Sequence, residues 1–186
     1  RRAFLARAGI RVATARAGNV IGGGDWAPDR IVPDLVRAML EERTLKVRNP
    51  AAIRPWQHVL EPLAGYQSLA RSLDEQAEGV EDCFNFGPGL DANRAVREVV
   101  EHAQAAWPEK HRGWTDGSCP DAPPEARILS LSSERAAARL GWRPRLTFDR
   151  AIKETMTWYH DSLGASAADL RDRSLGSIAR FEAVNA

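Results

Sequence analysis

The chain has 186 residues, of which 44% are hydrophobic and 27% charged, so it can bury one sizeable core. Its formal net charge of +1 comes from interspersed charges of both signs, which gives no reason to expect nucleic acid or a membrane surface as a partner. We expect neither a signal peptide nor a membrane span. Cys83 and Cys119 lack the spacing of a disulfide framework or a metal site, which indicates reduced thiols in a cytoplasmic protein and no bound metal.

The amino-terminal segment predicts a helix, a strand and a glycine-rich loop. Residues 1–8 have the pattern of the last turns of a helix that Gly9 ends, and residues 10–15 form an apolar, β-branched run typical of a strand. Three consecutive glycines follow at residues 22–24. Glycines let backbone N–H groups approach a ligand, and ligands of open α/β sheets bind beyond the carboxyl ends of strands. This loop is therefore the first candidate binding site, and a tight turn that needs positive φ is the alternative.

The rest of the chain alternates helix and strand patterns, which predicts the α/β class without an internal repeat. Helices are predicted from apolar spacing and capping residues over residues 30–43, 61–73, 94–107, 132–140 and 147–163. Strands are predicted over residues 45–48, 83–86 and 128–131, with a brief extended piece over 58–60. Polar loops are predicted over residues 49–57 and 108–124, the second with one strand near Trp114. The last residues predict a loosely attached helix or a disordered tail.

Arg54 is the strongest candidate for holding an anion. It begins the segment Arg-Pro-Trp-Gln-His-Val (residues 54–59), in which the proline stiffens the loop and Trp56 can pack beneath the guanidinium. A planar guanidinium held in one place makes two charge-assisted hydrogen bonds to a phosphate. The alternative is a surface arginine in an ion pair, and spacing alone does not separate the two.

Other polar residues stand at loop, strand or helix edges, where solvated side chains are commoner than ligand contacts. Those with cationic or amide side chains are Arg30, Arg48, Asn49 and Arg127. Asn19, in front of the glycines, can donate its amide to an anionic oxygen or cap its own turn. His58 invites a general-base interpretation, but a histidine on a short buried strand without an adjacent carboxylate is more often a core residue.

Two motifs of dinucleotide-dependent enzymes are missing from the sequence. No Gly-x-x-Gly-x-x-Gly or Gly-x-Gly-x-x-Gly fingerprint occurs, so no loop is patterned in this way to seat a dinucleotide pyrophosphate. No Tyr-x-x-x-Lys pair occurs either, because Tyr66 and Tyr159 are followed at the fourth position by Ala70 and Leu163.

Several motifs, in this order and spacing, carry a family resemblance. They are Arg-Ala-Gly-Asn-Val-Ile-Gly-Gly-Gly-Asp-Trp (residues 16–26), Asp-Arg-Ile-Val-Pro-Asp (29–34), Arg-Asn-Pro (48–50), Arg-Pro-Trp-Gln-His-Val (54–59), Asn-Phe-Gly-Pro (85–88) and Leu-Gly-Trp-Arg-Pro (140–144). The chain resembles the extended short-chain dehydrogenase/reductase family of NAD-dependent epimerases and dehydratases from about residue 9 to residue 159, and within it most closely the enzymes that dehydrate CDP-glucose. The resemblance implies the C-terminal part of a Rossmann-like fold, interwoven with a nucleotide-sugar-binding subdomain over residues 1–164, and a tail over residues 165–186.

The resemblance also implies roles for individual residues. By position, the segment Ala17, Gly18 and Asn19 would lie near the nicotinamide of NAD. The residues that would contact the nucleotide-sugar substrate are Asn19, Arg30, Ile31, Arg48, Asn49, Arg54 and Arg127. Arg54 matches the arginine that holds the diphosphate, Arg127 matches a second phosphate-side arginine less securely, and Arg48 and Asn49 would lie by the base or ribose.

In enzymes of this kind NAD takes a hydride from C4 of the sugar, water is lost across C5 and C6, and the hydride returns to C6. The tyrosine, the lysine and the NAD-binding glycine loop belong to the N-terminal part of the family. This chain has its first methionine at Met39, so we expect a piece of a longer protein. The resemblance implies that the whole protein is a homo-oligomer, and that this piece carries no catalytic residue and is inactive alone. The alternatives are an epimerase or dehydratase of dTDP-, GDP- or UDP-sugars, and a non-catalytic binding module.

Overall fold

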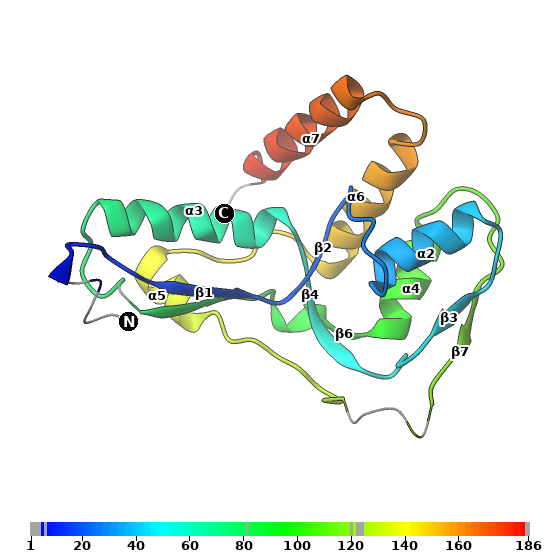
Figure 1. Cartoon of the computed structure of the whole chain (residues 1–186), viewed down its shortest axis with the longest axis horizontal. Coiled ribbons are helices and arrows are strands. Elements are labelled where there is room, and N and C mark those ends of the chain that lie inside the picture. Colours follow the sequence, from blue (N-terminus) through cyan, green and yellow to red (C-terminus); the bar gives the residue numbers. More distant parts are fainter. Residues whose placement is uncertain (1–4, 6, 81, 120, 122–124, 185–186) are drawn as a thin grey trace.

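The computed structural model describes residues 5, 7–80, 82–119, 121 and 125–184, so most of the helix predicted over residues 1–8 lies outside the described residues. Figure 1 shows an elongated molecule whose strands differ in direction along its long axis. Three helices lie above the strands in this view: α3 (Leu60–Asp74), α6 (Phe148–Asp161) and α7 (Ala167–Glu182). No helix in this part of the chain has the length and apolar character needed to cross a membrane.

The strands form three small sheets. In the first, β1 (Thr14–Ala17) pairs in parallel with β5 (Cys83–Phe86). In the second, β4 (Ile53–His58) is parallel to β2 (Asn19–Ile21) and antiparallel to β6 (Asn93–Ala95). In the third, β3 (Leu45–Val47) is parallel to β7 (Trp114–Asp116). Parallel strands joined through helices confirm the predicted α/β class.

Gly18 separates β1 from β2, so one extended segment contributes a strand to two sheets. A Cβ atom at Gly18 would lie 2.5 Å from the backbone oxygen of Pro55, so the close approach of this segment to β4 requires glycine. On β4, Gln57 donates a hydrogen bond from Nε2 to the backbone oxygen of Phe86 at 2.8 Å and thereby ties the second sheet to the first. The parallel pairing of β2 with β4 places Asn19 opposite Trp56.

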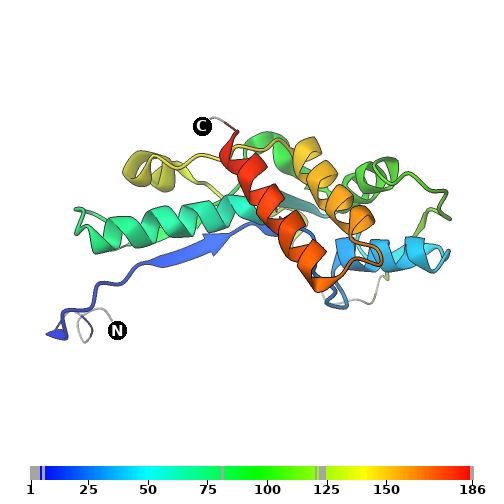
Figure 2. The same cartoon turned by 90° about the horizontal axis from the view of Figure 1, so that it is seen from above.

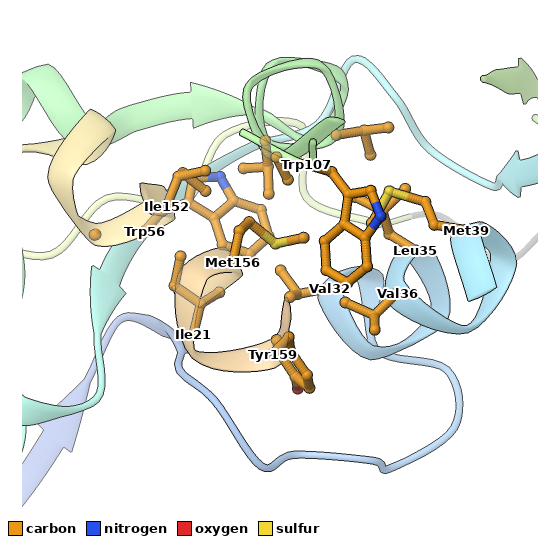
Figure 3. Close-up of a cluster of buried hydrophobic side chains, with 14 of the residues drawn as sticks. Ile21, Val32, Leu35, Val36, Met39, Trp56, Trp107, Ile152, Met156 and Tyr159 are labelled. Carbon is orange, nitrogen blue, oxygen red and sulfur yellow. The ribbon is translucent and has the colours of Figure 1, made fainter. Parts of the chain in front are cut away.

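The larger core lies between the second sheet and three helices, α2 (Ile31–Leu40), α4 (Val96–Ala105) and α6. Pro33 stands in the first turn of α2, where a missing backbone N–H leaves no helical hydrogen bond unmade. Figure 3 shows side chains of these elements interlocked around the two indole rings of the cluster, Trp56 and Trp107. The labelled members are Ile21, Val32, Leu35, Val36, Met39, Trp56, Trp107, Ile152, Met156 and Tyr159.

A second, smaller core lies between the first sheet and helices α3 and α5 (Glu134–Leu140). Phe86 packs edge-on against Trp142, with ring centroids 5.1 Å apart. A Cβ atom at Gly65 of α3 would lie 2.2 Å from the Phe86 ring, so this glycine sets how closely α3 approaches the sheet. The extended segment that forms β1 and β2 packs into the smaller core just before its start, at Ala13, and into the larger core at its end, at Ile21.

The tail forms helix α7, which Figure 2 shows passing between α3 and α6. Ser166 and Asp169 make reciprocal hydrogen bonds at its first turn, a capping box. At the other end Phe181 is buried, and the guanidinium of Arg145 lies 5.0 Å from its ring centroid. These contacts attach α7 to the rest of the chain near the start of α3.

Several expected strands are corrected by the structure. The strand expected over residues 10–15 begins later, at Thr14, because only from there does the segment pair with β5. The loop expected over residues 49–57 contains β4 instead: its polar residues are buried because β2 and β6 flank it. The extended piece expected at 58–60 ends at His58, where α3 follows, and the strand expected over 128–131 is one isolated bridge between Ile53 and Ile128.

The other expectations are close to the structure. The strands expected over 45–48, 83–86 and near Trp114 are confirmed, as are the five helices, with bounds that differ by a few residues. At the predicted cap of α6, the backbone N–H of Arg150 donates to Oγ1 of Thr147 at 3.3 Å. Cys83 and Cys119 are free and exposed.

Candidate functional site

A cleft of about 560 Å³ lies between the second sheet and the start of α2. Its walls are formed by residues 18–22, Asp25, residues 29–34, residues 45, 46, 48 and 49, Arg54 and Trp56 of β4, Val96 of α4, and Glu125. Cavities that bind small organic ligands have volumes of about 300 to 1,000 Å³. The cleft is therefore large enough for a nucleotide-sized molecule.

Arg54 and Trp56 face the cleft from β4, because alternate residues of a strand point to the same side. The Trp56 indole is 4% exposed and donates from Nε1 to the backbone oxygen of Arg94 at 2.9 Å. The side chain of Arg54 is 9% exposed, and its Nη1 donates to the backbone oxygen of Ile53 at 2.8 Å. The sequence predicted a guanidinium that is held in place, and the structure has one. Strand β4 holds it, and not the stiff loop that was expected.

Glu125 occupies the outer side of this guanidinium. One carboxylate oxygen accepts a hydrogen bond from Nη2 of Arg54, and the other accepts from Nδ2 of Asn49 at 3.0 Å. These two donors hold the pKa of the Glu125 carboxyl below its usual range. The segment that carries Glu125 is fixed beside β4 by backbone hydrogen bonds on both sides of Ile53, to Arg127 at 2.8 Å and from Leu129 at 3.0 Å.

The other cations of the cleft are exposed and already close to carboxylates. Nε of Arg30 lies 3.7 Å from Oδ2 of Asp25, and Nη2 of Arg48 lies 3.3 Å from Oδ1 of Asp29. Exposed pairs of this kind contribute little to stability and exchange partners readily. With Lys46 and Arg54, four cationic side chains line the cleft, and four carboxylates, Asp25, Asp29, Asp34 and Glu125, line it too. An anionic ligand is therefore favoured locally, beside a particular cation, and not by the net charge of the cleft.

The glycine-rich loop has two different surfaces. Gly22 lines the cleft, whereas a Cβ atom at Gly23 would lie 2.1 Å from the ring of Trp158. Gly23 is therefore required by packing against α6, and of the three glycines of the predicted loop Gly22 lines the cleft. The loop is anchored further on, where the hydroxyl of Tyr159 donates to the backbone oxygen of Asp25; burial raises the pKa of Tyr159 to about 12.

The structure brings together most of the predicted binding residues. Those that line the cleft are Gly18, Asn19, Arg30, Ile31, Arg48, Asn49 and Arg54. Among the described residues the side-chain amide of Asn19 has no hydrogen-bond partner, so its donor and acceptor are available to a ligand. Ala17 lies on β1, next to the cleft-lining Gly18.

Arg127 does not line the cleft. Its side chain is exposed, and its contribution in this structure is the backbone oxygen that accepts from Ile53. Glu125, two residues earlier, takes the position beside Arg54 instead. Sequence reasoning missed Glu125 because 71 positions separate it from Arg54 and no local pattern marks the contact.

His58 follows Trp56 on the same side of β4 but lies beyond the cleft. It is 6% exposed, the backbone N–H of Leu60 lies 3.4 Å from Nδ1, and burial lowers its pKa to about 4. Because this imidazole is buried and does not line the cleft, His58 is a core residue, which agrees with the structural interpretation and not with the general-base one.

Sequence comparison relates the chain to a nucleotide-sugar enzyme. It is 38% identical over 151 residues to CDP-glucose 4,6-dehydratase of Salmonella typhimurium, an alignment that covers 81% of this chain and 42% of that protein. The chain therefore spans less than half the length of this curated relative. No protein-family model matches.

Structure comparison gives the same assignment of the fold. The dTDP-glucose 4,6-dehydratase from Bacillus anthracis in complex with NAD superposes with a TM-score of 0.67 at 20% identity, over 87% of this chain and 49% of that one. The UDP-glucose 4-epimerase from Thermotoga maritima with UDP-glucose gives a TM-score of 0.69 at 18% identity, over 87% and 50%. At such identities the likeness concerns the fold alone.

Proposed function

Because this chain is related to the extended short-chain dehydrogenase/reductase epimerases and dehydratases and matches their C-terminal half, we propose that it forms the nucleotide-sugar-binding part of an NAD-dependent CDP-glucose 4,6-dehydratase. The observation that carries the proposal is the buried guanidinium of Arg54, which faces a cleft of nucleotide size beside Asn49. A buried cation that is open to a cleft on one side favours an anionic ligand there. A diphosphate is the anion common to CDP-, dTDP-, GDP- and UDP-sugars.

The residues of the cleft then have separate tasks. Arg54, with Asn49, binds a phosphate of the diphosphate, and Arg30 and Ile31 contact the nucleotide from the first turn of α2. Arg48 binds near the base or ribose. Arg127, exposed beside the cleft, serves as a second phosphate-side cation only after its side chain turns toward the ligand.

NAD is the cofactor that this proposal requires. When bound, it accepts the hydride from C4 of the sugar and returns it to C6 after water is lost. The residue of this chain that fits a role beside it is Asn19, whose amide is without a partner among the described residues and borders the cleft. Gly18 and Ala17 would face the cofactor through their backbone atoms. At Gly18 no side chain would stand between the backbone and the cofactor.

The chain by itself is proposed to be inactive. Its sequence contains no Tyr-x-x-x-Lys pair to move protons at C4 and no glycine fingerprint to seat the NAD pyrophosphate. The cleft residues described above bind and orient a substrate, and none of them is placed as the acid or base of a 4,6-dehydration. Addition of NAD and CDP-glucose to this chain is therefore expected to give no 4-keto product.

Isothermal calorimetry of the chain with CDP-glucose tests the proposal. Arg54→Ala should weaken binding by about 1.5 to 3 kcal/mol, the value of hydrogen bonds to a charged group. Arg171→Ala, which removes an exposed arginine of α7 outside the cleft, is the matched control and should bind as the unaltered chain does. Equal affinity of the Arg54 variant and the unaltered chain, with both folded by circular dichroism, would refute the assignment.

The same titration separates the alternatives. Tighter binding of dTDP-glucose or UDP-glucose than of CDP-glucose would keep the cleft and change the base. Binding of CDP-glucose with an encoding gene that lacks an upstream Tyr-x-x-x-Lys would instead support a non-catalytic binding module.

A further inference from the structure

The carboxylate of Glu125 bridges two donors that point toward the cleft. One oxygen accepts from Arg54 and the other from Asn49, at 3.0 Å for the second. A carboxylate and a phosphate present similar pairs of anionic oxygens to a guanidinium, so one group can replace the other on the same donors. In this structure the donors assigned to a phosphate are taken by the protein's own anion.

The two partners differ in how firmly they are held. The side chain of Arg54 is 9% exposed and is fixed by its bond to Ile53, whereas that of Glu125 is 58% exposed. Glu125 makes no other side-chain contact among the hydrogen bonds and ion pairs of the described residues. Rotation about its own side-chain bonds would therefore release the carboxylate into solvent without disturbing either core.

We propose that Glu125 is an internal competitor at the phosphate subsite: its carboxylate holds Arg54 and Asn49 in place before a ligand binds, and a phosphate of the ligand displaces it. This inference rests on the proposed function, because it takes the ligand of Arg54 to be a nucleotide-sugar diphosphate. The anion keeps a buried guanidinium from standing unpaired before the substrate arrives, which would be costly.

An internal competitor has a characteristic effect on affinity. Because Glu125 must leave before any phosphate binds, it weakens every phosphate-bearing ligand by the same factor. A ligand without phosphate, such as cytidine, does not displace it and is not affected. This pattern distinguishes competition from a direct contact between Glu125 and the base, which would affect cytidine and CDP-glucose together.

The test is calorimetry of the unaltered chain and Glu125→Gln with CDP-glucose, inorganic pyrophosphate and cytidine. The glutamine keeps an acceptor for Arg54 but removes the negative charge, so affinity for CDP-glucose and for pyrophosphate should rise by a common factor of about two to five, the range that corresponds to measured exposed ion pairs. Binding of cytidine should not change. Glu101→Gln, at an exposed position on α4 that is absent from the lining of the cleft, is the matched control and should change none of the three.

The outcomes separate this inference from the function on which it rests. If the unaltered chain binds CDP-glucose and Glu125→Gln binds it equally or more weakly, the competitor role is wrong and the proposed function stands. If neither protein binds CDP-glucose while both remain folded, the proposed function fails and the inference fails with it. A common gain for CDP-glucose and pyrophosphate without a gain for cytidine supports both.

Discussion

The burial of His58 predicts that this fold loses stability in mild acid. The imidazole is 6% exposed, between the first part of α6 and the C-terminal part of α7, and desolvation lowers its pKa from the ordinary value of 6.5 to about 4. The nearby carboxylate of Glu154 acts in the opposite direction but does not outweigh the burial. In the folded chain His58 therefore stays neutral throughout the range in which an exposed histidine takes up a proton.

The sign and size of the effect follow from this difference. Between pH 6.5 and about 4 the unfolded chain binds a proton at His58 that the folded chain does not, so the free energy of unfolding decreases as the pH falls. A pKa difference of this size corresponds to about 3 kcal/mol when the pH is below both values, because each pH unit contributes about 1.4 kcal/mol. At pH 5 about 2 kcal/mol of this amount is already lost.

Urea denaturation at pH 8 and pH 5, followed by tryptophan fluorescence, measures the loss. His58→Gln cannot take up the proton, so its decrease between the two pH values should be smaller than that of the unaltered chain by about 2 kcal/mol. Glu61 contributes with the opposite sign, because burial raises its pKa and its contribution is lost as the pH rises through the raised value. That contribution is common to both proteins and cancels in the comparison.

The result that would refute this reasoning is an equal pH dependence of the unaltered chain and the His58→Gln variant. It would mean that His58 takes up its proton in the folded chain at an ordinary pH, and hence that the imidazole is hydrated. A histidine titration by NMR, with the other three histidines as internal references, would show the same thing directly.

Three further outcomes are expected. Gly23→Ala should destabilise the fold by about 1 to 3 kcal/mol in urea, since its Cβ would meet the Trp158 ring at 2.1 Å, and an unchanged midpoint would contradict this packing. Removal of residues 165–186 should raise the pKa of His58 toward 6.5 by NMR, because Phe181 and its neighbours on α7 cover it; a pKa that stays near 4 would contradict that cover. The chain should self-associate with rising concentration, because β1 pairs only with β5 among the described strands and the side chain of Ile10 is 53% exposed. Light scattering measures the association, and Ile10→Lys should reduce it. A chain that stays monomeric at all concentrations would contradict this prediction.

Elements with a strong local signal were predictable from the sequence. Helix α4 has apolar residues at helical spacing, helix α6 begins at a threonine cap, and β5 is a short run of apolar residues bounded by a Gly-Pro-Gly turn. In each case a periodic or capping pattern within the element decides its conformation. The bounds differ by a few residues because helix ends depend on neighbouring chain segments.

Strand β4 was not predictable in this way, and it matters most for the site. Its sequence, Ile-Arg-Pro-Trp-Gln-His, has a proline and three polar residues, which locally favour a loop. The strand forms because β2 and β6 pair with its two edges and the larger core buries Trp56 on one of its faces. Sequence reasoning nevertheless identified Arg54, because a proline and a tryptophan next to an arginine indicate a held guanidinium in a loop and in a strand alike.

The cleft therefore joins predictable residue types through contacts that only the fold supplies. Arg54 was a candidate for its chemistry, but whether it binds a ligand or forms an ion pair depends on a carboxylate 71 positions away. The structure contains both situations at once: the guanidinium is buried and faces the cleft, and Glu125 is paired with it there. If the carboxylate leaves as a diphosphate enters, the ion pair and the bound phosphate are two successive states of one subsite. The alternative is an ion pair that is fixed and structural, and the comparison of Glu125→Gln with Arg54→Ala decides between the two. Tighter binding of CDP-glucose by Glu125→Gln together with weaker binding by Arg54→Ala would establish two successive states. Weaker binding by both variants would show that the ion pair is structural.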